Sequence, residues 1–293
     1  MDENELRRLI GRTRLAPSAE SLLGLARPAI HLRRQLLEDS DLGVGVSKLG
    51  GKPDLPPDFV WPSHGGIPLA FLAQLRFEEL APHDPEGVLP TRGLLSIFLG
   101  LAPQPSGLDF EERGRWVVAY HRAVPSDLAR RDPPEEWLSF ARTLAPFWNS
   151  GVLQSCSVGP VPALTLPDPH APEAEPFVAV SGRGYRSLVA STRAGLGPLH
   201  QVLGWPIIVQ GPVAEVCRSA TGGMPVQDRG ESLPKMDEAT YQNADEWRLL
   251  LQVDTDKAAG YEWGDNATLF FMIRPTDLRS ARFGNVWHVY QSH

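Results

Sequence analysis

The segment Ala70-Phe71-Leu72-Ala73-Gln74-Leu75 decides the fold class that the sequence predicts. Its apolar residues follow one another without alternation, which is typical of a strand that is covered on both faces. The segment Arg248-Leu249-Leu250-Leu251-Gln252-Val253 repeats the pattern, with one glutamine near its end. A polar loop and a second apolar run, residues 93–99 or 267–273, follow each segment. We therefore predict two related β-units that arose by duplication.

The glutamines of these segments, Gln74 and Gln252, each interrupt an apolar run. A buried amide that lacks hydrogen-bond partners costs about 1–3 kcal/mol, so both side chains must be paired. Either each amide binds backbone groups at the end of its strand, or both point into a shared cleft that holds a ligand.

The rest of the chain indicates an α+β fold with mostly antiparallel sheets and short peripheral helices. Its 28 prolines and 27 glycines favour many short elements joined by turns. The patterns predict further strands over residues 29–35, 115–121, 177–180, 207–210 and 283–290. They predict helices over residues 3–12, 19–26, 132–146, 198–203 and 212–220.

The predicted domain organisation is one domain over residues 41–293, preceded by an N-terminal helical arm, residues 1–40, that packs on it. The stretch at about residues 157–176 is rich in proline, so we expect a surface loop there.

The loop Ser47-Lys48-Leu49-Gly50-Gly51-Lys52-Pro53-Asp54-Leu55-Pro56, closed by Trp61-Pro62, resembles the opening signature of the YwqG-like family, a bacterial domain of unknown function. Three later stretches fit the same family in the same order: residues 68–75, residues 200–206 running on to Gln210, and residues 249–253 with Trp263-Gly264-Asp265. The family usually has glycine where this chain has Asn266, and asparagine also tolerates a left-handed turn. The resemblance implies a family and a single domain, but no reaction.

Nine residues of these motifs are candidates for ligand binding: Lys48, Asp54, Trp61, Gln74, His200, Gln210, Gln252, Trp263 and Asp265. We expect the loop 47–56 to pack beside the turn 261–266, because equivalent strand ends of a duplicated unit meet near its pseudo-twofold axis. One cation, carboxylates, amides and indoles suit a small polar or zwitterionic ligand or a peptide segment. The alternative is that Lys48 forms a structural ion pair with Asp54 or Asp265.

No activated nucleophile accompanies these residues, so the sequence assigns no catalytic residue. It favours a non-catalytic binding or regulatory protein for a small polar ligand or a protein partner. The alternatives are a hydrolase-type enzyme that uses Asp54, Asp265 and His200, or a toxin-neutralising partner protein, which the acidic charge fits.

The composition of the chain indicates which classes of partner and which cellular location to expect. A net charge of −7 argues against binding to nucleic acid or an anionic membrane. No signal peptide and no membrane-spanning run is present, and Cys156 and Cys217 fit no redox or metal spacing, so we expect a cytoplasmic protein with reduced thiols.

No metal and no cofactor is expected. The acidic loop 254–265 has Ala258 and Ala259 where a calcium loop needs a ligand and a glycine. The histidines lack the spacing of zinc ligands, and the oligomeric state is left open.

Overall fold

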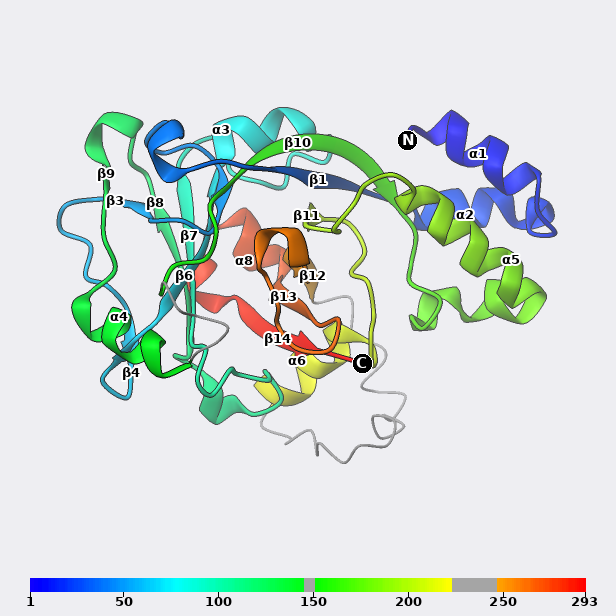
Figure 1. Ribbon diagram of the computed structural model, residues 1–293. Coiled ribbons are helices and arrows are strands. Elements are labelled where there is room, and N and C mark those ends of the chain that lie inside the picture. The colour runs from blue at the N-terminus through cyan, green and yellow to red at the C-terminus, as the bar shows by residue number, and fades with distance from the viewer. Residues whose placement is uncertain (145–150, 223–246) are drawn as a thin grey trace.

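A computed structural model describes residues 1–144, 151–222 and 247–293, and its main feature is one ten-stranded antiparallel sheet (Figure 1). From edge to edge the strands are β14 (Trp287–Gln291), β13 (Thr268–Ile273), β12 (Arg248–Asp254), β11 (Gln201–Leu203), β1 (Arg27–Leu36), β10 (Cys156–Thr165), β2 (Lys48–Leu49), β6 (Ala70–Arg76), β7 (Leu94–Leu99) and β8 (Trp116–His121). Two small ribbons pair β3 (Asp54–Leu55) with β9 (Ala129–Arg130), and β4 (Ser63–His64) with β5 (Ile67–Pro68).

The two hairpins that the sequence predicts, β6–β7 and β12–β13, are both present. In the first hairpin Gln74 lies opposite Ser96, and in the second Gln252 lies opposite Phe270. The register shifts between Phe71 and Ala73 in β6, and β12 has the same irregularity two residues before Gln252. Both hairpins therefore have the same pattern of pairing.

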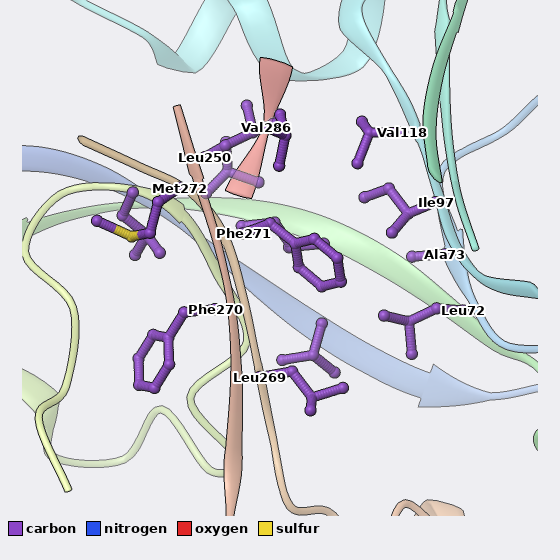
Figure 2. Close-up of a cluster of buried hydrophobic side chains, with 14 of the residues drawn as sticks. Leu72, Ala73, Ile97, Val118, Leu250, Leu269, Phe270, Phe271, Met272 and Val286 are labelled. Carbon is purple, nitrogen blue, oxygen red and sulfur yellow. The ribbon is translucent and has the colours of Figure 1, made fainter. Parts of the chain in front are cut away.

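The main core lies between the two ends of the curved sheet. Side chains from β6, β7 and β8 approach side chains from β12 and β13, as Ile97 and Phe271 do in Figure 2. Met272 points to the opposite side of β13 from Phe271, as successive residues of a strand must. The sheet therefore buries one face in this core and leaves its outer face to be covered by helices and loops.

Seven helices surround the sheet in the described residues: α1 (Glu3–Gly11), α2 (Ala19–Leu25), α3 (Phe77–Leu80), α4 (Glu135–Ala141), α5 (Glu175–Arg193), α6 (Val213–Thr221) and α8 (Pro275–Arg279). Helices α1, α2 and α5 share a separate hydrophobic cluster that contains Leu6, Leu22 and Tyr185. They gather at one end of the long strands β1 and β10 (Figure 1). In the described residues, no helix is both long and apolar enough to cross a bilayer.

The predicted arm of residues 1–40 differs from the structure in its extent. Its helices α1 and α2 are confirmed, but β1 lies between β11 and β10 at the centre of the main sheet. The helical part, up to Leu25, precedes the sheet.

The proline-rich stretch 157–176 was predicted as a loop, and this is wrong for its first half, which forms β10. Pro160 and Pro162 are two residues apart, so their missing N–H groups share one edge of the strand. That edge pairs with β2 only at Cys156 and Ser157 in the described residues, so no ladder hydrogen bond is lost at either proline.

Four other predicted elements differ from the structure. Residues 177–180 belong to α5. The sequence predicts a strand there because the apolar run is short and two glycines obscure the helical pattern that follows it. Residues 201–203 form strand β11 between β1 and β12 instead of a helical turn, and residues 207–210 are not a strand. The last strand, β14, begins only at Trp287. Of the helix predicted over 132–146, residues 145 and 146 lie outside the described residues, and the described part contains α4.

Candidate functional site

Lys48, the predicted cationic anchor, is fully buried in an ion-pair network. Its Nζ lies 2.8 Å from Asp39 Oδ1 and 3.9 Å from Asp54 Oδ2, and it also donates to the Lys52 carbonyl. Asp54 forms a second ion pair with Arg130, in which Arg130 Nε lies 2.9 Å from Asp54 Oδ1. Burial lowers the pKa of Lys48, and although burial acts to raise the pKa of Asp54, its partners hold that pKa below the usual value. The predicted Lys48–Asp54 pair is therefore present.

The side-chain amides of Gln74 and Gln252 form hydrogen bonds with backbone groups of the protein itself. Gln74 accepts from Asp54 N at 2.9 Å and donates to the Val46 carbonyl at 2.7 Å. Gln252 accepts from Ile207 N at 2.9 Å and donates to the Leu199 carbonyl at 2.8 Å. Both side chains are fully buried, so this geometry supports the interpretation that the amides hold backbone segments against the strand ends.

His200 and Trp263 lie together on the second half of the sheet. His200 is fully buried and accepts from Asp254 N at 3.1 Å through Nδ1, while its Nε2 lies 3.6 Å from Asp256 Oδ2. The Trp263 indole donates to the Asp254 carbonyl at 3.1 Å. Asp256 is held by Arg34, and its pKa is well below the usual value despite burial, which acts to raise it.

The remaining predicted residues lie elsewhere. Trp61 donates to the Leu69 carbonyl at 2.8 Å and packs its ring edge on Phe98. The backbone N–H of Gln210 donates to Gln291 Oε1 at 3.2 Å, and exposed Asp265 accepts from His293 N at 3.0 Å through its carbonyl.

The loop 47–56 lies against the first residue of the turn 261–266, because a Cβ at Gly50 would come within 2.6 Å of the Tyr261 hydroxyl oxygen. Gly51 and Lys52 line a broad hollow with Ala259 and Gly260, which encloses about 1050 Å³ with open solvent included. In the described residues no hydrogen bond or ion pair joins any two of Asp54, His200 and Asp265.

A second pocket lies beside α6, and it contains none of the nine residues predicted from the sequence. It encloses a cavity of about 50 Å³, between β12, β13, the first turn of α6 and the segment before α5. Its floor is apolar and includes Ile208, Leu249 and Met272. Glu215 and Trp247 also line it, and we call it the α6 pocket.

Two buried polar atoms of the α6 pocket have no hydrogen-bond partner in the described part of the chain. They are Glu215 Oε1 and Trp247 Nε1, and their residues are only 4% and 3% exposed. Burial, with a smaller contribution from Glu173, raises the pKa of Glu215 to about 7. An unpaired buried group costs about 1–3 kcal/mol, so a molecule that bonded to either atom would stabilise the protein.

Stacked cations fix the two indoles of the α6 pocket. The Arg27 guanidinium lies 3.5 Å from the ring centre of Trp205, and that of Arg274 lies 4.4 Å from the ring centre of Trp247. The Trp205 indole also donates to the Leu25 carbonyl at 2.7 Å. The walls of the pocket are therefore held in place before any ligand enters.

A sequence signal for this pocket exists, but it is faint. Glu215 lies in the first turn of α6 between the buried residues Val213 and Val216. An acid there normally interacts with the helix dipole from the surface, so it does not stand out. In the described residues no three histidine, cysteine or acidic side chains gather as metal ligands.

Comparison with known proteins gives a family but no function. A search of curated proteins found no match. The model of a family described as a domain of unknown function, DUF1963, matches residues 47–292, which is most of the chain. The chain therefore belongs to this family, the domain of unknown function DUF1963.

Proposed function

We propose that this protein is a non-catalytic binding protein that holds a small organic ligand in the α6 pocket. The observation that carries the proposal is the pair of unpaired buried atoms, Glu215 Oε1 and Trp247 Nε1, in one apolar pocket. A few polar groups on an apolar wall are typical of ligand sites, where they orient the ligand.

The lining of the α6 pocket favours binding over catalysis. In the described residues no serine, threonine, cysteine, lysine or histidine lines it, so it lacks the hydroxyl, thiol, amine and imidazole nucleophiles of covalent catalysis. The carboxyl of Glu215 can pair with a donor on the ligand, and the indole of Trp247 donates. A cavity of about 50 Å³ fits a molecule of only a few atoms, with one polar end.

A small ligand is also favoured over a protein partner. The large exposed apolar residues of the described chain lie on separate elements: Leu36, Val44, Val60, Phe110, Val124 and Val180. Single exposed apolar side chains are normal on a protein surface and do not form a docking patch.

The test is a ligand screen against the wild-type protein, Glu215→Gln and Trp247→Phe, followed by tryptophan fluorescence and melting temperature. We expect hits whose affinity falls about tenfold or more in both variants, because each loses one polar contact of about 1.5 kcal/mol. Glu136→Gln, an exposed change on α4, is the matched control. Hits that bind both pocket variants as tightly as the wild-type protein would disprove the proposal.

We also propose that the sheet arose by internal duplication. The ten strands divide into two halves of five, counted inward from each edge of the sheet. In this count β6 corresponds to β12, β7 to β13 and β8 to β14. Lys48 lies opposite Gln74, and Gln201 opposite Gln252, so β2 corresponds to β11 in the same register.

The loops after β2 and β11 support the same correspondence. Lys48 Nζ donates to the carbonyl four residues later, and Gln201 Nε2 donates to the Trp205 carbonyl, also four residues later, at 2.9 Å. Gly50 and Leu203 have φ of 62° and 61°, and the glycines that follow them have φ of 70° and 72°. A leucine rarely adopts this conformation, so the agreement favours common descent.

The order of the motifs supports the YwqG-like assignment of this domain. The two free, buried cysteines fit the proposed cytoplasmic location.

A further inference from the structure

We propose that the loop after β2 binds the carboxylate group of a small ligand, and that the side chain of Asp39 occupies this site in the free protein. The site lies apart from the α6 pocket and shares no lining residue with it, so the inference goes beyond the proposed function. Three observations support it: the donors around Asp39, the hollow beside them, and the residue that takes the place of Lys48 in the other half of the sheet.

Three donors hold the carboxylate of Asp39, and together we call them the carboxylate site. Lys48 Nζ donates to Oδ1 at 2.8 Å, the backbone N–H of Lys52 donates to Oδ2 at 2.6 Å, and Ser155 Oγ donates to Oδ1 at 3.3 Å. Gly51, with a φ of 70°, leaves room for the group, because a Cβ there would come within 2.6 Å of Oδ2. A cation, a backbone N–H and a hydroxyl directed at the two oxygens can bind a free carboxylate in the same way.

Only the side chain of Asp39 has to turn to free the carboxylate site. The guanidinium of Arg130 donates to the carbonyls of Asp39 and Leu42, so it holds the backbone of this segment in place. The Asp39 side chain is 19% exposed and lines the hollow, so a change of its χ1 rotamer can release the carboxylate without moving the chain. Asp39 therefore competes with a ligand for the same three donors.

The hollow beside the carboxylate site has room for the rest of a ligand. The centres of water-sized molecules can occupy about 500 Å³ of it, which lies within the range of small-molecule sites, about 300–1,000 Å³. Polar residues make up half of its lining: Glu38, Asp39, Ser40, Lys52, Gln154 and Ser155. A small polar molecule with one carboxylate group therefore suits the hollow.

The other half of the sheet indicates that the loop does not need the charge of Lys48. Gln201 takes the place of Lys48, and the side chain of each residue donates to the backbone carbonyl four residues later. A neutral amide is therefore enough to close a loop of this shape. A buried cation has a desolvation cost that an anion must offset, and Asp54, at 3.9 Å, is already paired with Arg130. The charge of Lys48 is thus accounted for by the carboxylate that it binds.

The first experiment empties the carboxylate site. Asp39→Ala removes the nearest anion of buried Lys48, so the melting temperature should fall. Sodium acetate should restore a large part of the loss in a saturable manner, because a bound ligand stabilises the folded state. Acetamide, which has the same shape without the charge, and sodium chloride at equal ionic strength should restore much less. An equal effect of acetate and chloride would overturn the inference.

The matched control for Asp39→Ala is Asp132→Ala. Asp132 also pairs with a lysine of the loop, Lys52, but its side chain is 77% exposed. Acetate should therefore not change the melting temperature of Asp132→Ala beyond the effect of chloride. A response as large as that of Asp39→Ala would mean that acetate acts on the protein surface, which would contradict a specific site.

The second experiment measures binding to the wild-type protein by calorimetry. N-acetylglycine carries a carboxylate on a small polar body, and N-acetylglycinamide has the same shape without the charge. We expect saturable binding of N-acetylglycine alone, and at least tenfold tighter binding in Asp39→Ala, where the internal competitor is absent. If the wild-type protein binds no N-acetylglycine, Asp39 is a structural counter-ion and the inference is wrong.

The third experiment gives the first half of the sheet the residue of the second half. Lys48→Gln can keep the hydrogen bond to the Lys52 carbonyl, as Gln201 does in its own loop, so the variant should unfold cooperatively. It should bind N-acetylglycine at least tenfold more weakly, because the charged donor is lost. Ser155→Ala, a milder change, should weaken binding about fivefold. Unchanged affinity in both variants would show that the probe binds elsewhere.

The outcomes separate this inference from the proposed function. Glu215→Gln should leave the affinity for N-acetylglycine unchanged, and Lys48→Gln should leave the binding of hits in the α6 pocket unchanged. If N-acetylglycine binding is lost in Glu215→Gln but kept in Lys48→Gln, the probe occupies the α6 pocket and only the carboxylate site is refuted. If hits from the screen bind independently of Glu215 and Trp247, only the proposed function fails.

Discussion

At the residue scale, the network around Lys48 is expected to stabilise the fold without contributing to ligand binding in the α6 pocket. Lys48→Met leaves Asp39 and Asp54 short of a buried cation, so we expect a loss of about 3 kcal/mol in the free energy of unfolding. Urea denaturation measures this loss, and ligand affinity in the α6 pocket should not change.

The matched control for Lys48→Met is Lys52→Met. The Lys52 side chain is 41% exposed and pairs with exposed Asp132, so its loss should cost less than about 1 kcal/mol. Weakened ligand binding at unchanged stability in Lys48→Met would instead support the site predicted from the sequence.

Glu215 gives the protein a pH-dependent stability that can be measured directly. Its pKa is about 7 in the folded protein against an ordinary value of 4.5, so the unfolded chain releases the proton first. Stability therefore falls as the pH rises from 4.5 to 7 and stays lower above that range. Glu173, Asp168 and Arg27 are the charged groups that line the same pocket.

Glu215→Gln should remove this loss of stability. We expect the variant to exceed the wild-type protein by up to about 3 kcal/mol at pH 8, and to match it below pH 4.5. Melting curves from pH 4 to 8 measure the difference, with Glu175→Gln, an exposed change, as control. A constant difference at every pH would mean that the carboxyl titrates normally.

The residues that could be predicted from the sequence are those whose type is unusual for their surroundings. Gln74 and Gln252 interrupt apolar runs, so their burial and their need for partners follow from the sequence alone. Glu215 and Trp247 have ordinary neighbours, and the pocket that buries them is made by five separate segments of the chain. No local pattern contains that information.

At the scale of elements, β10 shows how a loop prediction fails for a physical reason. A proline disrupts a strand only where its missing N–H would have donated a hydrogen bond to a neighbouring strand. In β10 the prolines lie opposite Leu32 and Ile30, and Leu32 N donates to His200 on the other side of β1. The hairpins β6–β7 and β12–β13 could be predicted because their partners are close in sequence, whereas the partner of β10 is more than a hundred residues away.

The alternation of β10 predicts opposite effects for two proline substitutions. Val161→Pro would remove an N–H that faces β1, so we expect a loss of about 3 kcal/mol or more. Leu164→Pro falls on the same edge as the native prolines and should cost clearly less. Chemical denaturation of both variants checks this; a smaller loss for Val161→Pro would mean that the ladder faces the other way.

At the scale of the whole molecule, the central pair of strands joins the two halves. β1 lies next to β11, and β10 lies next to β2, so each half of the sheet needs a strand from the other end of the chain. We expect neither fragment 1–144 nor fragment 151–293 to unfold cooperatively alone, and an equimolar mixture to regain the near-ultraviolet circular dichroism of the intact protein. A fragment that unfolds cooperatively by itself would show that the halves are independent.

The position of β1 also affects the chain during its synthesis. Residues 27–36 leave the ribosome early, but their neighbours in the sheet, residues 156–165 and 201–203, are translated more than a hundred residues later. At about 5–20 residues per second, that interval is on the order of ten seconds. For this time Ile30 and Leu32, both buried in the finished protein, have no strand beside them. The nascent chain is thus expected to need chaperone protection until its last third emerges.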